Sequence, residues 1–266
     1  MQLTIGFSPC PNDTFMLDAL IHHRIPGSGI SWKEHVEDVE TLNTWAIEGR
    51  LDVSKMSFSA WLRVQDEYAL LSSGAALGHG CGPLVIAKTP ISENELLQGP
   101  VGIPGELTTA NLLFSLMYPQ ARHKIPMIFS DIESAVSNGK VIAGVIIHEN
   151  RFTYAQKGLV KIQDLGEYWE RETGFPIPLG AFAAKKGLGK EVITSIEAQI
   201  RDSILLAFDN PEIPMQYVRQ NAQEMDDNVM RAHISTYVND FSLNLGSQGL
   251  EAVRILQARA INAGLI

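Results

Sequence analysis

The chain has 266 residues, of which 45% are hydrophobic and 19% are charged, and its formal net charge is −9. This composition is typical of a globular protein that forms one large domain or two smaller lobes. No basic cluster stands out, so we expect no nucleic-acid partner, and no run of about 18 apolar residues predicts a membrane span.

The first predicted element is an apolar strand over residues 3–7. It leads into the loop Ser8-Pro9-Cys10-Pro11-Asn12-Asp13, after which a helix is expected over 13–23. Asn12 or Asp13 is the expected cap of this helix, because side-chain oxygens of these residue types accept hydrogen bonds from first-turn N–H groups. The free N–H groups at such a junction favour a small anion.

Strands and helices alternate along the following residues, which predicts an α/β fold. Further strands are expected at 30–36, 51–56, 68–72, 83–87, 101–103, 126–130, 143–148 and 176–184. Further helices are expected at 39–48, 58–65, 93–98, 110–118, 132–138, 190–209 and 248–263. The last two helices are amphipathic, and each has an apolar face to bury against its own lobe or against a second copy of the chain in a homodimer.

The order of these elements predicts two lobes. The pattern of strand, polar loop and helix starts again near Val101, and extended segments at 81–88 and 175–185 flank the middle of the chain. A lobe inserted into another is joined to it by two crossing strands. We therefore expect a large lobe of residues 1–87 and 182–266, an inserted small lobe of residues 88–181, and a ligand cleft between them.

His148 is the strongest candidate for a catalytic residue. It ends the apolar strand predicted at 143–148, and ligands of open α/β sheets gather beyond the carboxyl ends of the strands. Histidine is also the usual general base near neutral pH. The alternative is a histidine that caps the strand and bonds a neighbouring carbonyl. Among the other six histidines, His79 is the best candidate because it lies in a glycine-rich run.

Two further strand-to-helix junctions resemble the first one. Thr108, Thr109 and Ala110 begin a helix after Pro104-Gly105, and Lys55-Met56-Ser57 lies between a strand and a helix. Their hydroxyls and free N–H groups suit a carboxylate or a sugar hydroxyl, whereas the phosphate-loop pattern is absent. The structural alternative is that the hydroxyls are helix caps and that Lys55 is a solvated surface charge.

Cys10 and Cys81 are the only cysteines, and their separation matches no metal-ligand motif. Cys10 is either a nucleophile activated by the helix start or a residue packed beneath the loop. The amino terminus lacks a basic region followed by an apolar stretch, so we expect no secretory leader, a cytoplasmic location and reduced cysteines.

Four segments together resemble one enzyme family. They are Ser8-Pro9-Cys10-Pro11-Asn12-Asp13-Thr14-Phe15, Lys55-Met56-Ser57, Gly105-Glu106-Leu107-Thr108-Thr109-Ala110 and Ile147-His148-Glu149-Asn150-Arg151-Phe152-Thr153-Tyr154. In order and spacing they resemble the 1,4-dihydroxy-6-naphthoate synthases of the futalosine pathway of menaquinone biosynthesis, over essentially the whole length.

The resemblance implies a two-lobed fold like that of type II periplasmic binding proteins. It also implies that cyclic dehypoxanthinylfutalosine is converted to 1,4-dihydroxy-6-naphthoate with release of a small sugar-derived fragment, without a cofactor or a metal. His148 would be the proton acceptor, and Lys55, Met56, Ser57, Thr109 and Ala110 would contact the small carboxylate substrate. Two rival functions are the chorismate dehydratase of the same pathway and a non-catalytic solute-binding protein.

Overall fold

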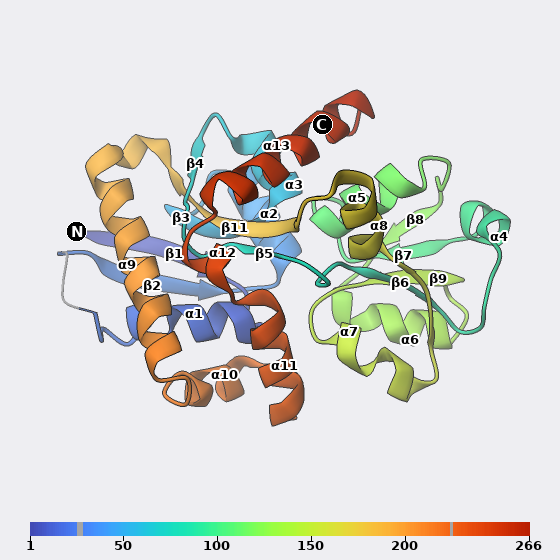
Figure 1. Cartoon of the computed structure of the whole chain (residues 1–266), viewed down its shortest axis with the longest axis horizontal. Coiled ribbons are helices and arrows are strands. Elements are labelled where there is room, and N and C mark those ends of the chain that lie inside the picture. Colours follow the sequence, from blue (N-terminus) through green and yellow to red (C-terminus); the bar gives the residue numbers. More distant parts are fainter. Residues whose placement is uncertain (26–28, 224–225) are drawn as a thin grey trace.

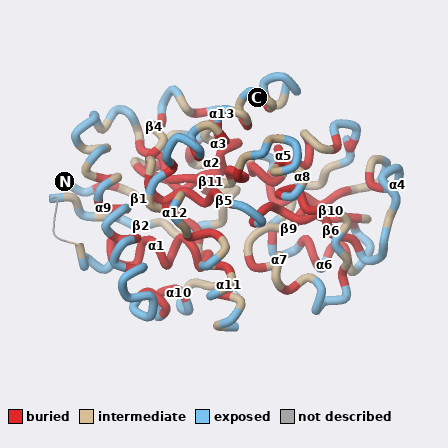
Figure 2. The backbone as a smooth tube through the Cα atoms, in the orientation of Figure 1, coloured by how far each residue is buried: buried red, intermediate tan, exposed pale blue. Residues whose placement is uncertain are grey.

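Two α/β lobes, each built on its own sheet, make up the chain in the computed structural model (Figure 1). The structure describes residues 1–25, 29–223 and 226–266. One sheet has the order β2-β1-β3-β11-β4 with β5 paired to β11, and the other has the order β10-β6-β9-β7-β8. Buried residues follow the central strands of both sheets, whereas exposed residues lie on the edge strand β2 and on the outer helices and loops (Figure 2).

The strands of the first sheet are β1 (Gln2–Phe7), β2 (Ser31–Val36), β3 (Val53–Ser57), β4 (Tyr68–Leu70), β5 (Ala76–Gly78) and β11 (Ile177–Lys185). Those of the second sheet are β6 (Leu84–Ala87), β7 (Val101–Ile103), β8 (Lys124–Pro126), β9 (Ala143–Ile146) and β10 (Val160–Asp164). β1 pairs in parallel with β2 and β3, whereas β11 runs antiparallel to its three partners.

The helices before the second sheet are α1 (Pro11–Ile21), α2 (Val39–Ile47) and α3 (Phe58–Val64). Those connecting its strands are α4 (Glu93–Gln98), α5 (Thr109–Met117), α6 (Ile132–Ser137) and α7 (Asn150–Thr153), and α8 (Leu165–Thr173) links β10 to β11 of the first sheet. After β11 follow α9 (Lys190–Asp209), α10 (Met215–Asn221), α11 (Asp227–Tyr237), α12 (Asp240–Leu243) and α13 (Gly246–Asn262). Single 3₁₀ turns occur at Phe129–Asp131, Tyr154–Lys157 and Lys186–Leu188.

The two connections between the sheets lie where extended segments were expected. β6 belongs to the second sheet and β11 to the first. The chain therefore passes into the second sheet before Leu84 and returns before Ile177, a few residues ahead of the boundaries expected at 87/88 and 181/182. Both segments are apolar because their strands are buried in the sheets that they enter.

Two local predictions are wrong. The strand predicted at 126–130 is displaced, because β8 pairs with the three-residue β7 and its ladder ends at Pro126, after which Phe129–Asp131 forms a 3₁₀ turn. The cap of α1 also differs: Cys10 is the N-cap and makes no side-chain cap bond. Pro11 begins the helix, and the carboxylate of Asp13 bonds instead to the N–H and the hydroxyl of Ser8.

The strand β5 was not predicted, since its residues Ala76-Leu77-Gly78 lie inside a glycine-rich run. Its small residues are buried where it pairs with β11, and Gly78 leaves room for the Asn239 side chain, which donates to the Leu77 carbonyl at 3.0 Å. Tertiary pairing therefore outweighs the low strand propensity of glycine.

The long helices α9 and α13 bury apolar faces within the chain. α9 packs on α1, and α13 packs on β11 and α5. Leu205, Leu206 and Phe208 of α9 remain partly exposed, and the homodimer stays a prediction. Of the helices in the described ranges, none is long and apolar enough to span a membrane.

Candidate active site

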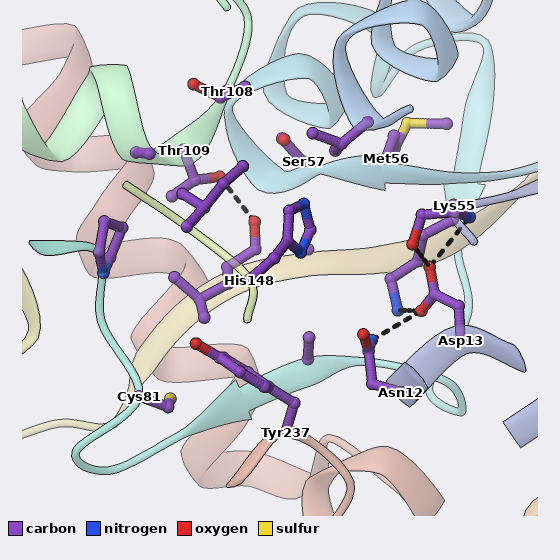
Figure 3. A pocket seen from close by; sticks show the side chains of 18 of the residues that line it. Asn12, Asp13, Lys55, Met56, Ser57, Cys81, Thr108, Thr109, His148 and Tyr237 are labelled. Carbon is purple, nitrogen blue, oxygen red and sulfur yellow. Dashed lines mark hydrogen bonds and ion pairs between the residues drawn. The ribbon is translucent and has the colours of Figure 1, made fainter. Parts of the chain in front are cut away.

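The three helix starts singled out in the sequence converge on one cavity between the lobes (Figure 3). The first lobe contributes residues that precede or begin α1 and α3, and the second lobe contributes the start of α5 and the end of the β9 segment. All six predicted site residues line the cavity: Lys55, Met56, Ser57, Thr109, Ala110 and His148.

A left-handed backbone conformation sets the direction of the His148 side chain. Its φ angle is 56°, a value that non-glycine residues seldom adopt. β9 ends at Ile146 and α7 begins at Asn150, so His148 lies in the tight turn between them. Arg151, in the first turn of α7, forms an ion pair with Asp164 at 2.9 Å and anchors this turn to the second sheet. A strained backbone conformation such as that of His148 is often found at functional sites.

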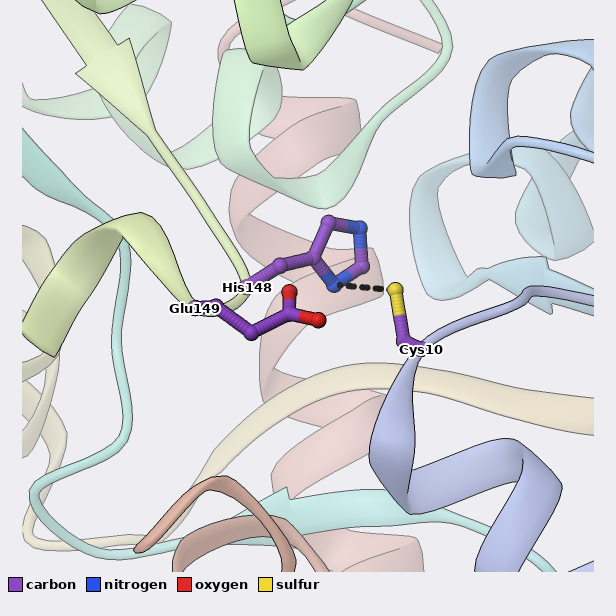
Figure 4. Close-up of side chains that lie close together, drawn as sticks. All are labelled: Cys10, His148 and Glu149. Atoms are coloured by element: carbon purple, nitrogen blue, oxygen red, sulfur yellow. Dashed lines mark hydrogen bonds between the residues drawn. The ribbon is translucent and has the colours of Figure 1, made fainter. Parts of the chain in front are cut away.

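The His148 imidazole contacts Cys10 of the other lobe (Figure 4). Its Nδ1 lies 3.3 Å from the Cys10 Sγ, and its Nε2 is buried with no hydrogen-bond partner among the described residues. Burial lowers the pKa of His148 to about 4, although the Asp13 carboxylate opposes the shift. The imidazole is therefore neutral at pH 7 and has a nitrogen available for proton transfer.

This lowered pKa predicts a pH-dependent contribution to stability. In the unfolded chain His148 has an ordinary pKa near 6.5, so the unfolded state binds more protons than the folded state as the pH falls from about 6.5 to about 4. Relative to a His148→Asn variant, we expect the wild-type free energy of unfolding to drop by about 2 kcal/mol between pH 7 and pH 5. Urea denaturation of both proteins at both pH values measures this difference. An equal change in the unfolding free energy of the wild type and the variant would contradict it.

Lys55 is a buried cation held within the first lobe. Its Nζ lies 2.8 Å from the Asp13 Oδ1, donates to the Gly74 carbonyl at 2.9 Å and lies over the Phe182 ring. The Lys55 and Asp13 side chains are 7% and 2% exposed, so Lys55 is not the solvated surface charge of the structural alternative.

The hydroxyls at the other two helix starts differ in their bonding. Ser57 is the N-cap residue of α3, but its side chain makes no cap bond; its Oγ accepts from Asn43 Nδ2 at 3.1 Å. Thr108 caps α5 by accepting from the Asn111 N–H. The Thr109 hydroxyl donates to the Leu179 carbonyl at 2.7 Å and accepts from the Ser59 N–H at 3.2 Å, so it ties α5 to the first lobe.

These differences predict that one small substitution weakens substrate binding and another lowers stability. Ser57→Ala removes a hydroxyl whose proton remains available to a ligand, so we expect weaker substrate binding by about 1 kcal/mol and little change in stability. Thr109→Val removes the hydroxyl that pairs with the part-buried Leu179 carbonyl and the buried Ser59 N–H, which should cost about 1–3 kcal/mol of unfolding free energy. Product titration and thermal denaturation of both variants measure the two effects. Equal losses of stability would identify Ser57 as structural too.

Several residues of the site were missed or ranked low from the sequence. His233 of α11 lines the cavity and lies 6.2 Å from His148 between ring centroids, with the rings nearly parallel. Tyr237, one turn later, packs on His233 with ring centroids 4.5 Å apart. Both lie on the buried face of an amphipathic helix, a pattern that is more often core than catalytic, so no local signal separates them from packing residues.

One group of side chains has donor atoms close enough to share a metal ion. The donor atoms of Cys10, His148 and Glu149 lie within 4.8 Å of one another. Burial, and secondarily the Glu149 carboxylate, raises the pKa of the Cys10 thiol well above its ordinary value. The thiol is therefore protonated at neutral pH, and a metal would have to displace that proton.

Solved structures share the fold of this chain. A protein of Archaeoglobus fulgidus superposes with a TM-score of 0.95 at 33% identity, covering 100% of this chain and 98% of that one. The alkanesulfonate-binding protein of Xanthomonas axonopodis, bound to MOPS, superposes with a TM-score of 0.73 at 14% identity, covering 99% and 93%. The periplasmic aliphatic sulphonate binding protein of Escherichia coli gives 0.67 at 13%, covering 100% and 88%. The last two show the fold alone.

The chain therefore has the two-lobed fold of periplasmic binding proteins, with a histidine beside the cavity between the lobes, and the predicted fold class is confirmed. A family model described as "Menaquinone biosynthesis" matches residues 3–262. The chain belongs to this menaquinone biosynthesis family.

Two curated relatives carry the same enzyme name. The 1,4-dihydroxy-6-naphthoate synthase of Thermus thermophilus is 47% identical over 263 residues, which are 99% of this chain and 95% of that protein. The enzyme of that name from Streptomyces coelicolor is 44% identical over 272 residues, covering 99% and 94%. The resemblance inferred from the four segments is thus confirmed, as is the prediction of an enzyme.

Proposed function

We propose that this chain converts cyclic dehypoxanthinylfutalosine to 1,4-dihydroxy-6-naphthoate in the cytoplasm, with release of a small sugar-derived fragment, and that His148 is the general base. The proposal is carried by a neutral imidazole whose buried Nε2 has no partner among the described residues, placed beside the cavity where three helix starts meet. The two relatives named 1,4-dihydroxy-6-naphthoate synthase support the reaction.

The chemistry needs a base and donors for developing negative charge. Removal of a proton from the substrate starts cleavage of a carbon–carbon bond and leaves an electron pair that is delocalised onto an oxygen. The first-turn N–H groups of Thr109 and Ala110 have no carbonyl partner within α5 and border the cavity, so they suit that oxygen or the substrate carboxylate. Lys55, Met56 and Ser57 border it from the other lobe.

We expect the lobes to separate when the substrate enters. The cavity encloses about 90 Å³, less than the roughly 300 Å³ at the lower end of small-molecule sites. Closure after binding excludes water from the reacting groups and strengthens each electrostatic interaction with the substrate.

Incubation with two substrates tests the proposal. We expect the purified protein to turn over the cyclic futalosine derivative, with the naphthoate detected by mass spectrometry, and to leave chorismate unchanged. Turnover of chorismate alone would assign the chain to the dehydratase instead. A ligand that is bound but recovered unchanged after long incubation would indicate a solute-binding protein.

A further inference from the structure

The second histidine beside the cavity, His233, is held by a chain of hydrogen bonds that begins at Lys55. His233 is 1% exposed, and its Nε2 lies 2.9 Å from the Asn12 Oδ1. The amide nitrogen of Asn12 donates to the Asp13 Oδ1 at 2.8 Å, and the same oxygen is 2.8 Å from the Lys55 Nζ. The Asp13 Oδ2 accepts from the Ser8 hydroxyl and N–H.

This chain of bonds determines which nitrogen of His233 carries the proton. Asp13 is surrounded by donors, so it accepts at both oxygens, and Asn12 must present its NH₂ group to the carboxylate. The Asn12 carbonyl oxygen therefore faces His233, and an oxygen can only accept. Nε2 of His233 must be the protonated nitrogen, and Nδ1 carries the lone pair.

The surroundings of Nδ1 suit a group that gains and loses a proton. Among the described residues Nδ1 has no hydrogen-bond partner, and the Glu149 Oε2 lies 4.0 Å from it. Within the described part of the chain, the titratable groups that face the ring are His148 and Glu149 from the turn before α7 and Tyr237 from α11, and Phe152 also contacts the ring. Burial, with a smaller contribution from His148, keeps the pKa of His233 well below its ordinary value.

We propose that His233 is a second catalytic residue of the site, and that its Nδ1 accepts a proton from the substrate in one step and returns it in another. This inference rests on the proposed function. In the first step an O–H or C–H bond of the substrate breaks, the electron pair stays on the substrate, and Nδ1–H forms on an imidazolium. In the second, the same proton goes to the carbon that retains the electron pair of the broken carbon–carbon bond. Protons and electrons balance without a further reagent.

Asn12 is a positioning residue in this scheme. It holds Nε2–H in both protonation states of His233, so the incoming proton can bind only at Nδ1. The Glu149 Oε2 faces the His233 ring at 4.0 Å. A charged His148 would oppose the His233 imidazolium, so the two histidines hold their protons at different times.

The tautomer can be tested without turnover. In ¹⁵N-histidine-labelled protein at pH 7, long-range ¹H–¹⁵N correlation should show the His233 ring neutral with its proton on Nε2, and a His233→Gln sample assigns the signal. In an Asn12→Ala variant we expect a mixture of both tautomers. A wild-type ring protonated on Nδ1, or charged at pH 7, would overturn the inference.

Kinetics test the catalytic role. We expect His233→Gln to lower kcat by about 100-fold or more, the range of general acid–base catalysis, with product affinity retained. Asn12→Ala should lower kcat by about 10-fold. It should also shift the acid limb of the pH profile of kcat, which the loss of a merely structural residue would not move. His123→Gln, which changes an exposed histidine outside the site, is the control.

An active wild type with an equally active His233→Gln variant overturns only this inference, whereas an inactive wild type overturns the proposed function. If His233→Gln fails to fold, the inference is tested by the kinetics of Asn12→Ala and by the tautomer of His233 in the wild-type spectrum.

Discussion

Replacing His148 with asparagine should remove most of the turnover while the protein still folds. Asparagine tolerates the left-handed backbone that His148 adopts, whereas alanine would be strained there and would confuse loss of a base with loss of the turn. Without the imidazole nothing accepts the substrate proton at this position, so kcat should fall by about 10²–10⁴-fold. Single-turnover assays measure the rate, and calorimetric titration with the product should show retained binding.

The chain offers a matched control for this variant. His23, at the end of α1, has a φ angle of 55° and lies outside the cavity lining. His23→Asn makes the same chemical change on the same backbone conformation, so we expect full activity. Near-normal turnover by His148→Asn would remove His148 as the base, and equal losses in both variants would point to the backbone rather than the imidazole.

Replacing Lys55 with methionine should cause the largest loss of stability. The substitution leaves the Asp13 carboxylate buried without its cation, and breaking a buried ion pair from one side costs about 3–5 kcal/mol. It also weakens the arrangement that orients Asn12 toward His233. Urea denaturation at pH 7 measures the unfolding free energy, and a normal midpoint would show that solvent or a neighbouring donor replaces the ammonium.

A double-variant cycle isolates the pair. In Lys55→Met combined with Asp13→Asn no uncompensated charge remains, so the loss should be smaller than the sum of the single losses by at least about 2 kcal/mol. The control is Arg231→Met, which breaks the exposed pair with Glu212 and should leave the unfolding free energy nearly unchanged, because solvent screens that pair. Strict additivity at Lys55 and Asp13 would mean that the two charges do not stabilise each other.

The local organisation of the chain was predictable from residue patterns. β7, α4 and α9 lie where they were predicted, because short-range hydrophobic periodicity and helix-start residues act over a few neighbouring positions. The same local signals located the end of the β9 segment and hence His148. They failed at β5 and at the displaced β8, where pairing with a distant strand decides the conformation.

What only the tertiary structure decided is which groups meet. Cys10 contacts His148 across 138 residues, and Asn12 contacts His233 across 221 residues, so no local pattern carries either pairing. The roles of the polar side chains also depend on long-range contacts. The Thr109 hydroxyl, for example, already bonds to the Leu179 carbonyl and the Ser59 N–H. By itself the sequence determined the α/β order, the three helix starts and the family resemblance. Long-range packing decided the hydrogen-bond partners of the two histidines and the buried ion pair, because burial and hydrogen-bond partners exist only after the two lobes assemble.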